Sequence, residues 1–149
     1  MTSSTRSNCL AKLSDEGNFH TTVIDMSKDG SHIATGSKMG TVNIYAFNQS
    51  TQILSGKPQK SILNLTTSIT DLKFHPSSKL LAVCSKWKKN ALRMVHIPSY
   101  TTYQNFPGAA VGILKYPMNI EFDRQNGNYL AMGNDEGKAH LWNLQSFHN

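Results

Sequence analysis

Hydrophobic and polar residues alternate along many short segments of this chain, and turns rich in Gly, Asp, Ser or Pro separate the segments. Alternation with a period of two is the pattern of a β-strand that buries one of its faces. No stretch of about ten residues shows the periodicity of an amphipathic helix. The pattern therefore predicts an all-β protein.

The alternation belongs to a larger unit that recurs along the chain. Residues 24–35 align with residues 72–83 and again with residues 120–132, and one alanine marks each copy: Ala34, Ala82 and Ala131. The marker alanines lie 48 and 49 residues apart, slightly more than the about 40 to 45 residues of a WD40 blade. Longer connecting loops account for the difference. Each unit predicts a strand, a polar turn, a second strand, a tight turn and a third strand.

The predicted third strands cover residues 41–45, 91–95 and 138–142. They resemble the WD40 strand that ends in Trp-Asp, although that dipeptide is replaced in all three, so we expect the hydrogen-bond network built on its Asp to be degenerate. Fourth, outer strands are predicted at residues 60–65 and 101–106, where apolar and polar residues again alternate.

These elements predict a partial WD40-type β-propeller of about three four-stranded antiparallel blades over residues 1–149. We expect a lone outer strand at 8–13, blades at 20–65 and 69–106, and a blade at 118–144 that lacks its outer strand. Three blades cannot close a ring that usually holds about seven. We therefore expect the chain to be the C-terminal part of one propeller, packed against blades supplied by the same parent protein.

Charge and composition narrow the range of partners. The 149 residues carry a formal net charge of +6 and a pI near 9.4, which favours an anionic partner such as a phosphate backbone but also suits plain solubility. No run of about 18 apolar residues and no secretory leader is present, so we expect an intracellular protein without membrane contact. Cys9 and Cys84 lack zinc-ligand spacing, and we expect both to be reduced core residues.

Nothing in the sequence predicts an enzyme. No Gly-x-Ser-x-Gly motif appears, the six histidines are scattered rather than spaced as metal ligands, and Gly30–Lys38 departs from the phosphate-loop pattern. The carboxylates Asp15, Glu16, Asp135 and Glu136 lie in predicted turns, where they cap the backbone. We expect no catalytic residues, no metal and no cofactor.

The turns between second and third strands share one face of such a propeller, and we predict partner contacts there. In the longest of them Trp87 stands among lysines, so it can stack on a base while the ammonium groups approach phosphates. The alternative is a basic hairpin whose Trp folds back on its own blade. The candidate RNA or protein contacts are Lys38, Lys86, Trp87, Lys88, Lys89, Lys115 and Tyr116.

Several stretches are more specific than the WD40 repeat. They are residues 6–10 with 15–17, residues 40–45, residues 62–67, residues 93–99, residues 105–107 and residues 131–139. On these stretches the chain resembles the C-terminal blades of the small nucleolar RNA-associated protein eighteen family, WD40 subunits of the small-subunit processome.

That resemblance implies a non-enzymatic scaffold that supports pre-ribosomal RNA processing and small-subunit RNA maturation. It implies a location in the nucleus, within the nucleolus. The implied partners are other processome proteins and the U-three small nucleolar ribonucleoprotein, with pre-ribosomal RNA as a further contact. The alternative is a WD40 adaptor of another complex that binds a peptide on the same face, such as a ubiquitin-ligase substrate receptor or a chromatin reader.

Overall fold

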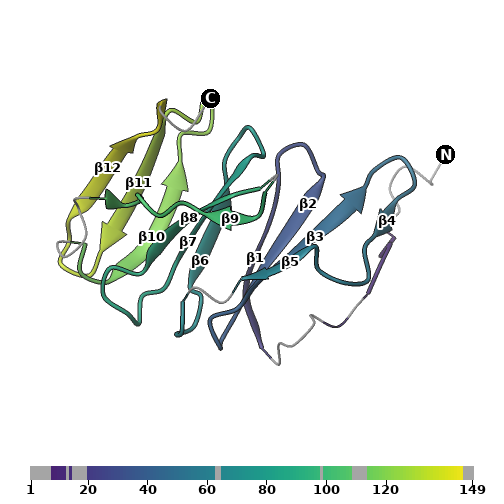
Figure 1. The fold of residues 1–149 in the computed structure, drawn as a ribbon, viewed down its shortest axis with the longest axis horizontal. Coiled ribbons are helices and arrows are strands. Elements are labelled where there is room, and N and C mark those ends of the chain that lie inside the picture. Colours follow the sequence, from purple (N-terminus) through teal and green to yellow (C-terminus); the bar gives the residue numbers. More distant parts are fainter. Residues whose placement is uncertain are drawn as a thin grey trace.

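Three antiparallel β-sheets stand side by side in the computed structural model (Figure 1). The structure describes residues 8–12, 14, 20–62, 65–97, 99–108 and 114–145. Within these ranges the chain forms twelve strands and no α-helix. The all-β, propeller-like architecture predicted from the repeat is confirmed.

The first sheet contains five strands. They are β1 (Thr21–Met26), β2 (His32–Ser37), β3 (Val42–Asn48), β4 (Ile53–Leu54) and β5 (Lys60–Ile62). The outer edge of β3 is covered in two pieces, because β4 pairs with Phe47 and Asn48 whereas β5 pairs with residues 42–44. A single outer strand was predicted at 60–65, and its first three residues form β5.

The second sheet contains four strands and the third contains three. The second comprises β6 (Asp71–Phe74), β7 (Leu80–Cys84), β8 (Leu92–His96) and β9 (Thr101–Thr102). The third comprises β10 (Pro117–Phe122), β11 (Tyr129–Asn134) and β12 (Ala139–Asn143). The predicted outer strand at 101–106 forms only at its first two residues.

The predicted lone outer strand at 8–13 is described only over residues 8–12. Residues 8–12 have no strand assignment, Leu10 is 55% exposed, and residue 13 lies outside the described ranges. A strand needs a neighbour to satisfy its backbone groups, and no described segment pairs with residues 8–12. Cys9 is also exposed rather than a core residue, whereas Cys84 is buried and burial raises the pKa of its thiol to about 12.

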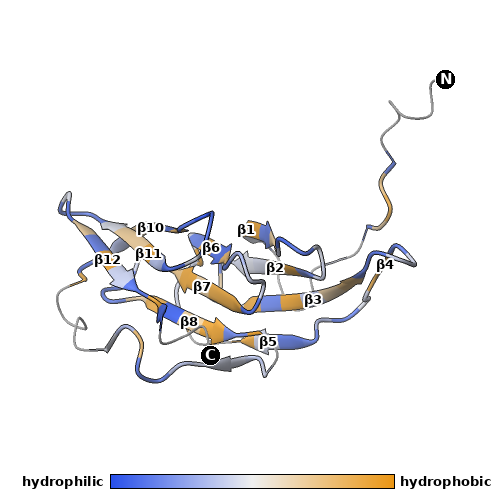
Figure 2. Cartoon of the chain, turned by 90° about the horizontal axis from the view of Figure 1, so that it is seen from above, coloured by the Kyte–Doolittle hydropathy of each residue, from blue (hydrophilic) through white to orange (hydrophobic). Residues whose placement is uncertain are grey.

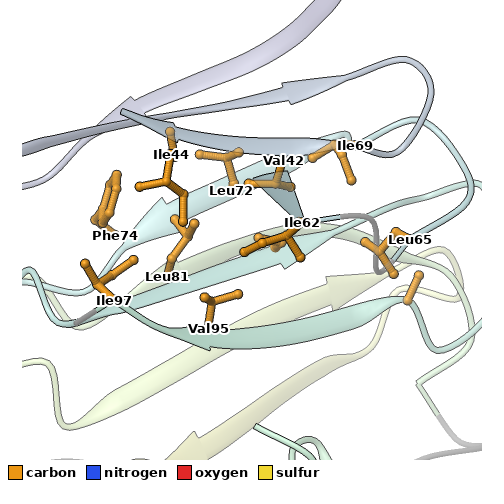
Figure 3. Close-up of a cluster of buried hydrophobic side chains, with 13 residues drawn as sticks. Val42, Ile44, Ile62, Leu65, Ile69, Leu72, Phe74, Leu81, Val95 and Ile97 are labelled. Atoms are coloured by element: carbon orange, nitrogen blue, oxygen red, sulfur yellow. The ribbon is translucent and has the colours of Figure 1, made fainter. Parts of the chain in front are cut away.

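Two apolar cores hold the three sheets together. The core between the first and second sheets gathers side chains from both, including Ile44 and Val42 on one side and Leu72 and Leu81 on the other (Figure 3). The core between the second and third sheets includes Leu80, Met94, Ile120, Leu130 and Met132. The second sheet therefore buries both of its faces, and Figure 2 shows hydrophobic residues along β7.

Candidate functional site

Buried polar side chains at the ends of the second strands shape three hairpins. Ser37, Ser85 and Asn134 hold equivalent positions, and each is buried. The Ser37 hydroxyl accepts hydrogen bonds from the amides of Met39 (3.2 Å) and Thr41 (3.1 Å). Asn134 Oδ1 likewise accepts hydrogen bonds from the amides of Glu136 and Lys138, both at 2.9 Å. Such side-chain caps satisfy turn amides that the strands leave unpaired, so these hairpins are held in fixed positions.

Each hairpin also contacts a segment that leads into a sheet. The amide of Lys38 donates to the carbonyl of His20 at 3.0 Å, and the amide of Asn90 donates to the carbonyl of Lys115 at 2.7 Å. Gly40 has φ +91°, and a Cβ there would lie 1.9 Å from the carbonyl oxygen of Leu65. The hairpins and these connecting segments therefore form one continuous face, which we call the hairpin face: residues 38–40, 65–67, 86–90, 114–116 and 135–137.

The longest hairpin on this face presents the predicted aromatic residue to solvent. Trp87 is 62% exposed, and the ammonium nitrogen of Lys86 lies 5.0 Å from the centroid of its ring. The Trp is therefore not folded into its own sheet. Lys88 and Lys89 are also exposed, and Lys88 Nζ lies 3.5 Å from the hydroxyl of Thr66 on the neighbouring segment.

Lys38, Lys115 and Tyr116 occupy the same face but differ in exposure. Lys38 is exposed, whereas Lys115 and Tyr116 are half-buried. Tyr116 exchanges hydrogen bonds with Asp135, whose carboxylate accepts from the Tyr116 amide at 3.1 Å while its own amide donates to the Tyr116 carbonyl at 3.2 Å. Asp135 was predicted to cap the backbone of its own turn, but its carboxylate instead bonds the segment that leads into β10, while Asn134 caps the turn.

The charge on the hairpin face is unevenly distributed. In the described ranges the ion pairs are Lys73 with Asp71 and Arg124 with Glu121, so none of the hairpin-face lysines lies within ion-pair distance of a described carboxylate. The hairpin of the third sheet instead carries Glu136, which is exposed. The face therefore runs from a basic, aromatic part over the first two sheets to an acidic part over the third.

Contacts that lock one sheet to the next were not predicted from the sequence. Asp25 Oδ2 accepts the amide of Phe74 at 2.8 Å, and Asp71 Oδ2 accepts the amide of Ile120 at 2.9 Å. Both bonds join residues 49 positions apart, close to the repeat period, which is the one signal in the sequence that could have identified them. Each fixes the first strand of the following sheet.

His75 makes a further lock between the second and third sheets. Its Nδ1 accepts the amide of Ser77 at 2.9 Å, so Nε2 carries the proton and donates to the carbonyl of Gly127 at 2.7 Å. Gly127 has φ +67°, and a Cβ there would lie 2.2 Å from His75 Nε2. The buried histidine therefore serves the packing of two sheets rather than a metal or a reaction.

Polar residues near the β1–β2 turn lock the first sheet to the second. The amide of Asp29 donates to the Ser78 hydroxyl at 3.1 Å, and His32 Nε2 lies 3.3 Å from the hydroxyl of Tyr100. Burial opposes ionisation of Asp29, but hydrogen bonds from Ser31, Ser27 and Ser78 together lower the pKa of Asp29 to about 2. Burial lowers the pKa of His32, which keeps the ring neutral at physiological pH.

The described residues contain no group of three or more His, Cys, Asp or Glu side chains placed to hold a metal ion. Within the same ranges there is also no helix with the length and hydropathy required to cross a bilayer.

Comparisons with known proteins agree with this architecture. Residues 49–89 match the WD40 family, described as WD domain, G-beta repeat. The chain is 39% identical over 139 residues to a mouse protein named U3 small nucleolar RNA-associated protein 18 homolog, and 37% identical over 139 residues to its human counterpart. It is 34% identical over 124 residues to the Saccharomyces cerevisiae U3 small nucleolar RNA-associated protein 18.

These alignments cover most of this chain but a small part of the relatives. The mouse and human alignments each cover 93% of this chain and 25% of the relative, so the chain spans about a quarter of their length. Among solved structures, the β-propeller domain of Cps50 (Swd1) from Myceliophteria thermophila matches with a TM-score of 0.59 at 17% identity. That match covers 85% of this chain and 36% of the propeller, and it supports the fold alone.

Proposed function

Because the chain belongs to the WD40 region of the U3 small nucleolar RNA-associated protein 18 family, we propose that it is a non-catalytic scaffold of the small-subunit processome. In this role it supports pre-ribosomal RNA processing in the nucleolus. The observation that carries the proposal is the similarity itself, which extends along nearly the whole chain to relatives named for association with the U3 small nucleolar RNA. Sheets locked by buried hydrogen bonds suit a part that holds its neighbours in fixed geometry.

Depletion of the protein tests this role. We expect unprocessed small-subunit precursor RNA to accumulate, as measured by hybridisation, and the tagged protein to sediment with U3-containing particles in the nucleolus. Normal maturation after depletion, together with absence from those particles, would overturn the proposal and favour an adaptor of another complex.

We propose that the basic part of the hairpin face is where the scaffold meets an anionic neighbour. Lys86, Lys88 and Lys89 have no carboxylate within ion-pair distance in the described ranges, and Lys86 lies against the exposed indole of Trp87. An unneutralised basic cluster with an aromatic ring favours phosphates and bases. Lys38, Lys115 and Tyr116 extend this contact surface on either side.

Crosslinking of the assembled particle tests the contact surface. A variant combining W87A, K86A and K88A should lose most ultraviolet crosslinks to RNA or lysine crosslinks to a neighbouring protein. Lys79→Ala removes an exposed charge at the opposite end of β7 and should leave the crosslinks unchanged. Equal crosslinking in both variants would place the contact elsewhere.

We also propose that further blades pack on the two outer faces of the stack. Ile24 and Met26 on β1 are 64% and 47% exposed, and Leu141 on β12 is 69% exposed. All three point away from the neighbouring described sheet, since the alternate residues of each strand contact the cores. Covering such apolar positions is the usual role of adjacent blades in a propeller.

A further inference from the structure

A groove on the outer rim of the second sheet has a chemistry that the scaffold role does not explain. It has a volume of about 420 Å³, within the range of about 300 to 1,000 Å³ found for ligand clefts. Its walls come from β8, from the end of the preceding hairpin and from residues 102–107. The side chains that matter below are Lys89, Arg93, Tyr103 and Phe106.

The groove exists because the outer strand of the second sheet is short. In the first sheet, residues 42–44 at the start of β3 pair with β5. The equivalent positions of the second sheet are residues 92–94, but β9 pairs only with Val95 and His96. The amide of Tyr103 also donates to the carbonyl of Met94 at 2.8 Å. No strand pairing with Leu92 and Arg93 on this side is therefore observed in the described ranges, and the groove lies beside this part of β8.

Arg93 is fixed in the lining of this groove. Its Nη1 donates to the carbonyls of Leu92 at 2.9 Å and Asn90 at 3.2 Å. A guanidinium has five N–H donors, and within the described ranges no hydrogen bond from Nε or Nη2 to the protein is observed. That pair forms the edge of the guanidinium that binds a carboxylate through two parallel hydrogen bonds. Because the backbone already orients the group, little conformational freedom is lost on binding.

The rest of the groove complements a peptide rather than an isolated anion. Lys89 is an exposed part of the lining, and no described carboxylate lies within ion-pair distance of Lys89 or Arg93. Phe106 and Pro107 are buried and supply an apolar part of the lining, to which the half-buried Tyr103 also belongs. We propose that this groove binds an extended acidic peptide, with one carboxylate on Arg93 and a second near Lys89. Its hydrophobic side chains contact the apolar wall.

The proposal can be tested with the whole propeller protein that contains these residues and a short fluorescent peptide that alternates Glu with Val. Anisotropy should report binding of this peptide, and no binding of the analogue that has Gln in place of Glu. Lys89→Glu should weaken binding about tenfold or more, because it replaces attraction by repulsion. Lys88→Glu changes the charge of the same hairpin outside the groove lining and should weaken binding less than about twofold.

Arg93 is tested by two substitutions. Arg93→Gln should weaken binding at least as much as Lys89→Glu, and Arg93→Lys should recover only part of the loss because it keeps the charge without the planar fork. Arg93 also caps two carbonyls, so a urea unfolding curve must accompany each variant. If Arg93→Gln does not fold, the comparison of Lys89→Glu with Lys88→Glu still tests the proposal, because both lysines are exposed.

Three results would overturn the proposal. They are equal binding of the Glu and Gln peptides, equal weakening by the Lys88 and Lys89 variants, and no binding of the Glu peptide at millimolar concentration. Tighter binding of a single-stranded oligouridylate through Arg93 and Lys89 would also reject it and identify nucleic acid as the ligand. None of these results depends on a role in ribosome assembly, so the two proposals can fail separately.

Discussion

Strand β7 in the second sheet and strand β12 in the third sheet occupy different positions in the same stack. All five residues of β7 are buried, and they divide between two cores: Leu81 and Val83 contact the first sheet, whereas Leu80, Ala82 and Cys84 contact the third. In β12 the burial alternates, with Leu141 exposed and its neighbours His140 and Trp142 partly buried. Trp142 packs against the core shared with the second sheet. The two strands therefore differ because β7 packs against neighbouring sheets on both faces, whereas β12 packs against a described sheet on one face.

The largest difference should appear when one leucine of each strand is shortened. Leu81→Ala removes a side chain that is fully buried, and such changes cost about 2 to 5 kcal/mol. Leu141→Ala removes a side chain that is 69% exposed, and surface changes usually stay within about 0.5 kcal/mol. Urea unfolding of both variants measures the two losses. A comparable loss for Leu141→Ala would mean that its face is covered in solution, which would support packing of a further blade.

The sequence already contained much of this difference. The β7 segment is a continuous apolar run, which is typical of strands buried on both faces. The β12 segment is less informative, because its apolar Leu141 is exposed whereas its polar His140 is partly buried. The repeat also located the first three strands of each sheet to within a few residues. For example, the third strand predicted at 91–95 forms at Leu92–His96.

The outer strands and the hydrogen bonds between sheets were harder to predict from the sequence. The outer edge of the first sheet is divided because Gly56 and Pro58 interrupt the alternation between β4 and β5. Proline cannot donate a ladder hydrogen bond, so a continuous strand is not available there. The locks made by Asp25, Asp71 and His75 depend on amides or carbonyls about one repeat away. Local patterns carry no information on such pairs. The candidate contact residues could be located on one face from the repeat, but their partner stays a prediction.

A second comparison concerns two glycines with the same backbone conformation and different surroundings. Gly127 and Gly137 have φ +67° and +77°, and an alanine in this region costs about 1 to 2 kcal/mol. A Cβ at Gly137 meets nothing within 4 Å, whereas a Cβ at Gly127 would collide with His75. Gly127→Ala should therefore cost about 1 to 3 kcal/mol more than Gly137→Ala, because it also breaks a buried hydrogen bond. Equal unfolding midpoints would show that the His75 lock contributes nothing.

The smallest expected effects separate the two interfaces of the second sheet by their response to pH. Asp29, at the interface with the first sheet, has a pKa lowered to about 2 from an ordinary value of 3.8. Its stabilisation is complete above the ordinary value and is lost as the pH falls towards 2. At the interface with the third sheet, burial raises the pKa of Asp71, although the Ile120 amide and Lys73 oppose that shift. The folded state therefore holds the Asp71 proton more tightly, and stability falls as the pH rises through the raised pKa.

Two isosteric variants test these opposite signs by urea midpoints measured across acid and neutral pH. Asp29→Asn should remove the loss of stability that the native chain shows as the pH falls from about 4 to about 2. Asp71→Asn should remove the fall in stability that accompanies the rise of pH through the Asp71 pKa. It should leave stability at neutral pH unchanged or slightly higher, because the amide oxygen can still accept from Ile120 and no buried charge remains. A lower midpoint for Asp71→Asn at neutral pH would mean that the carboxylate charge holds the second and third sheets together. The two interfaces would then both be locked by ionised aspartates.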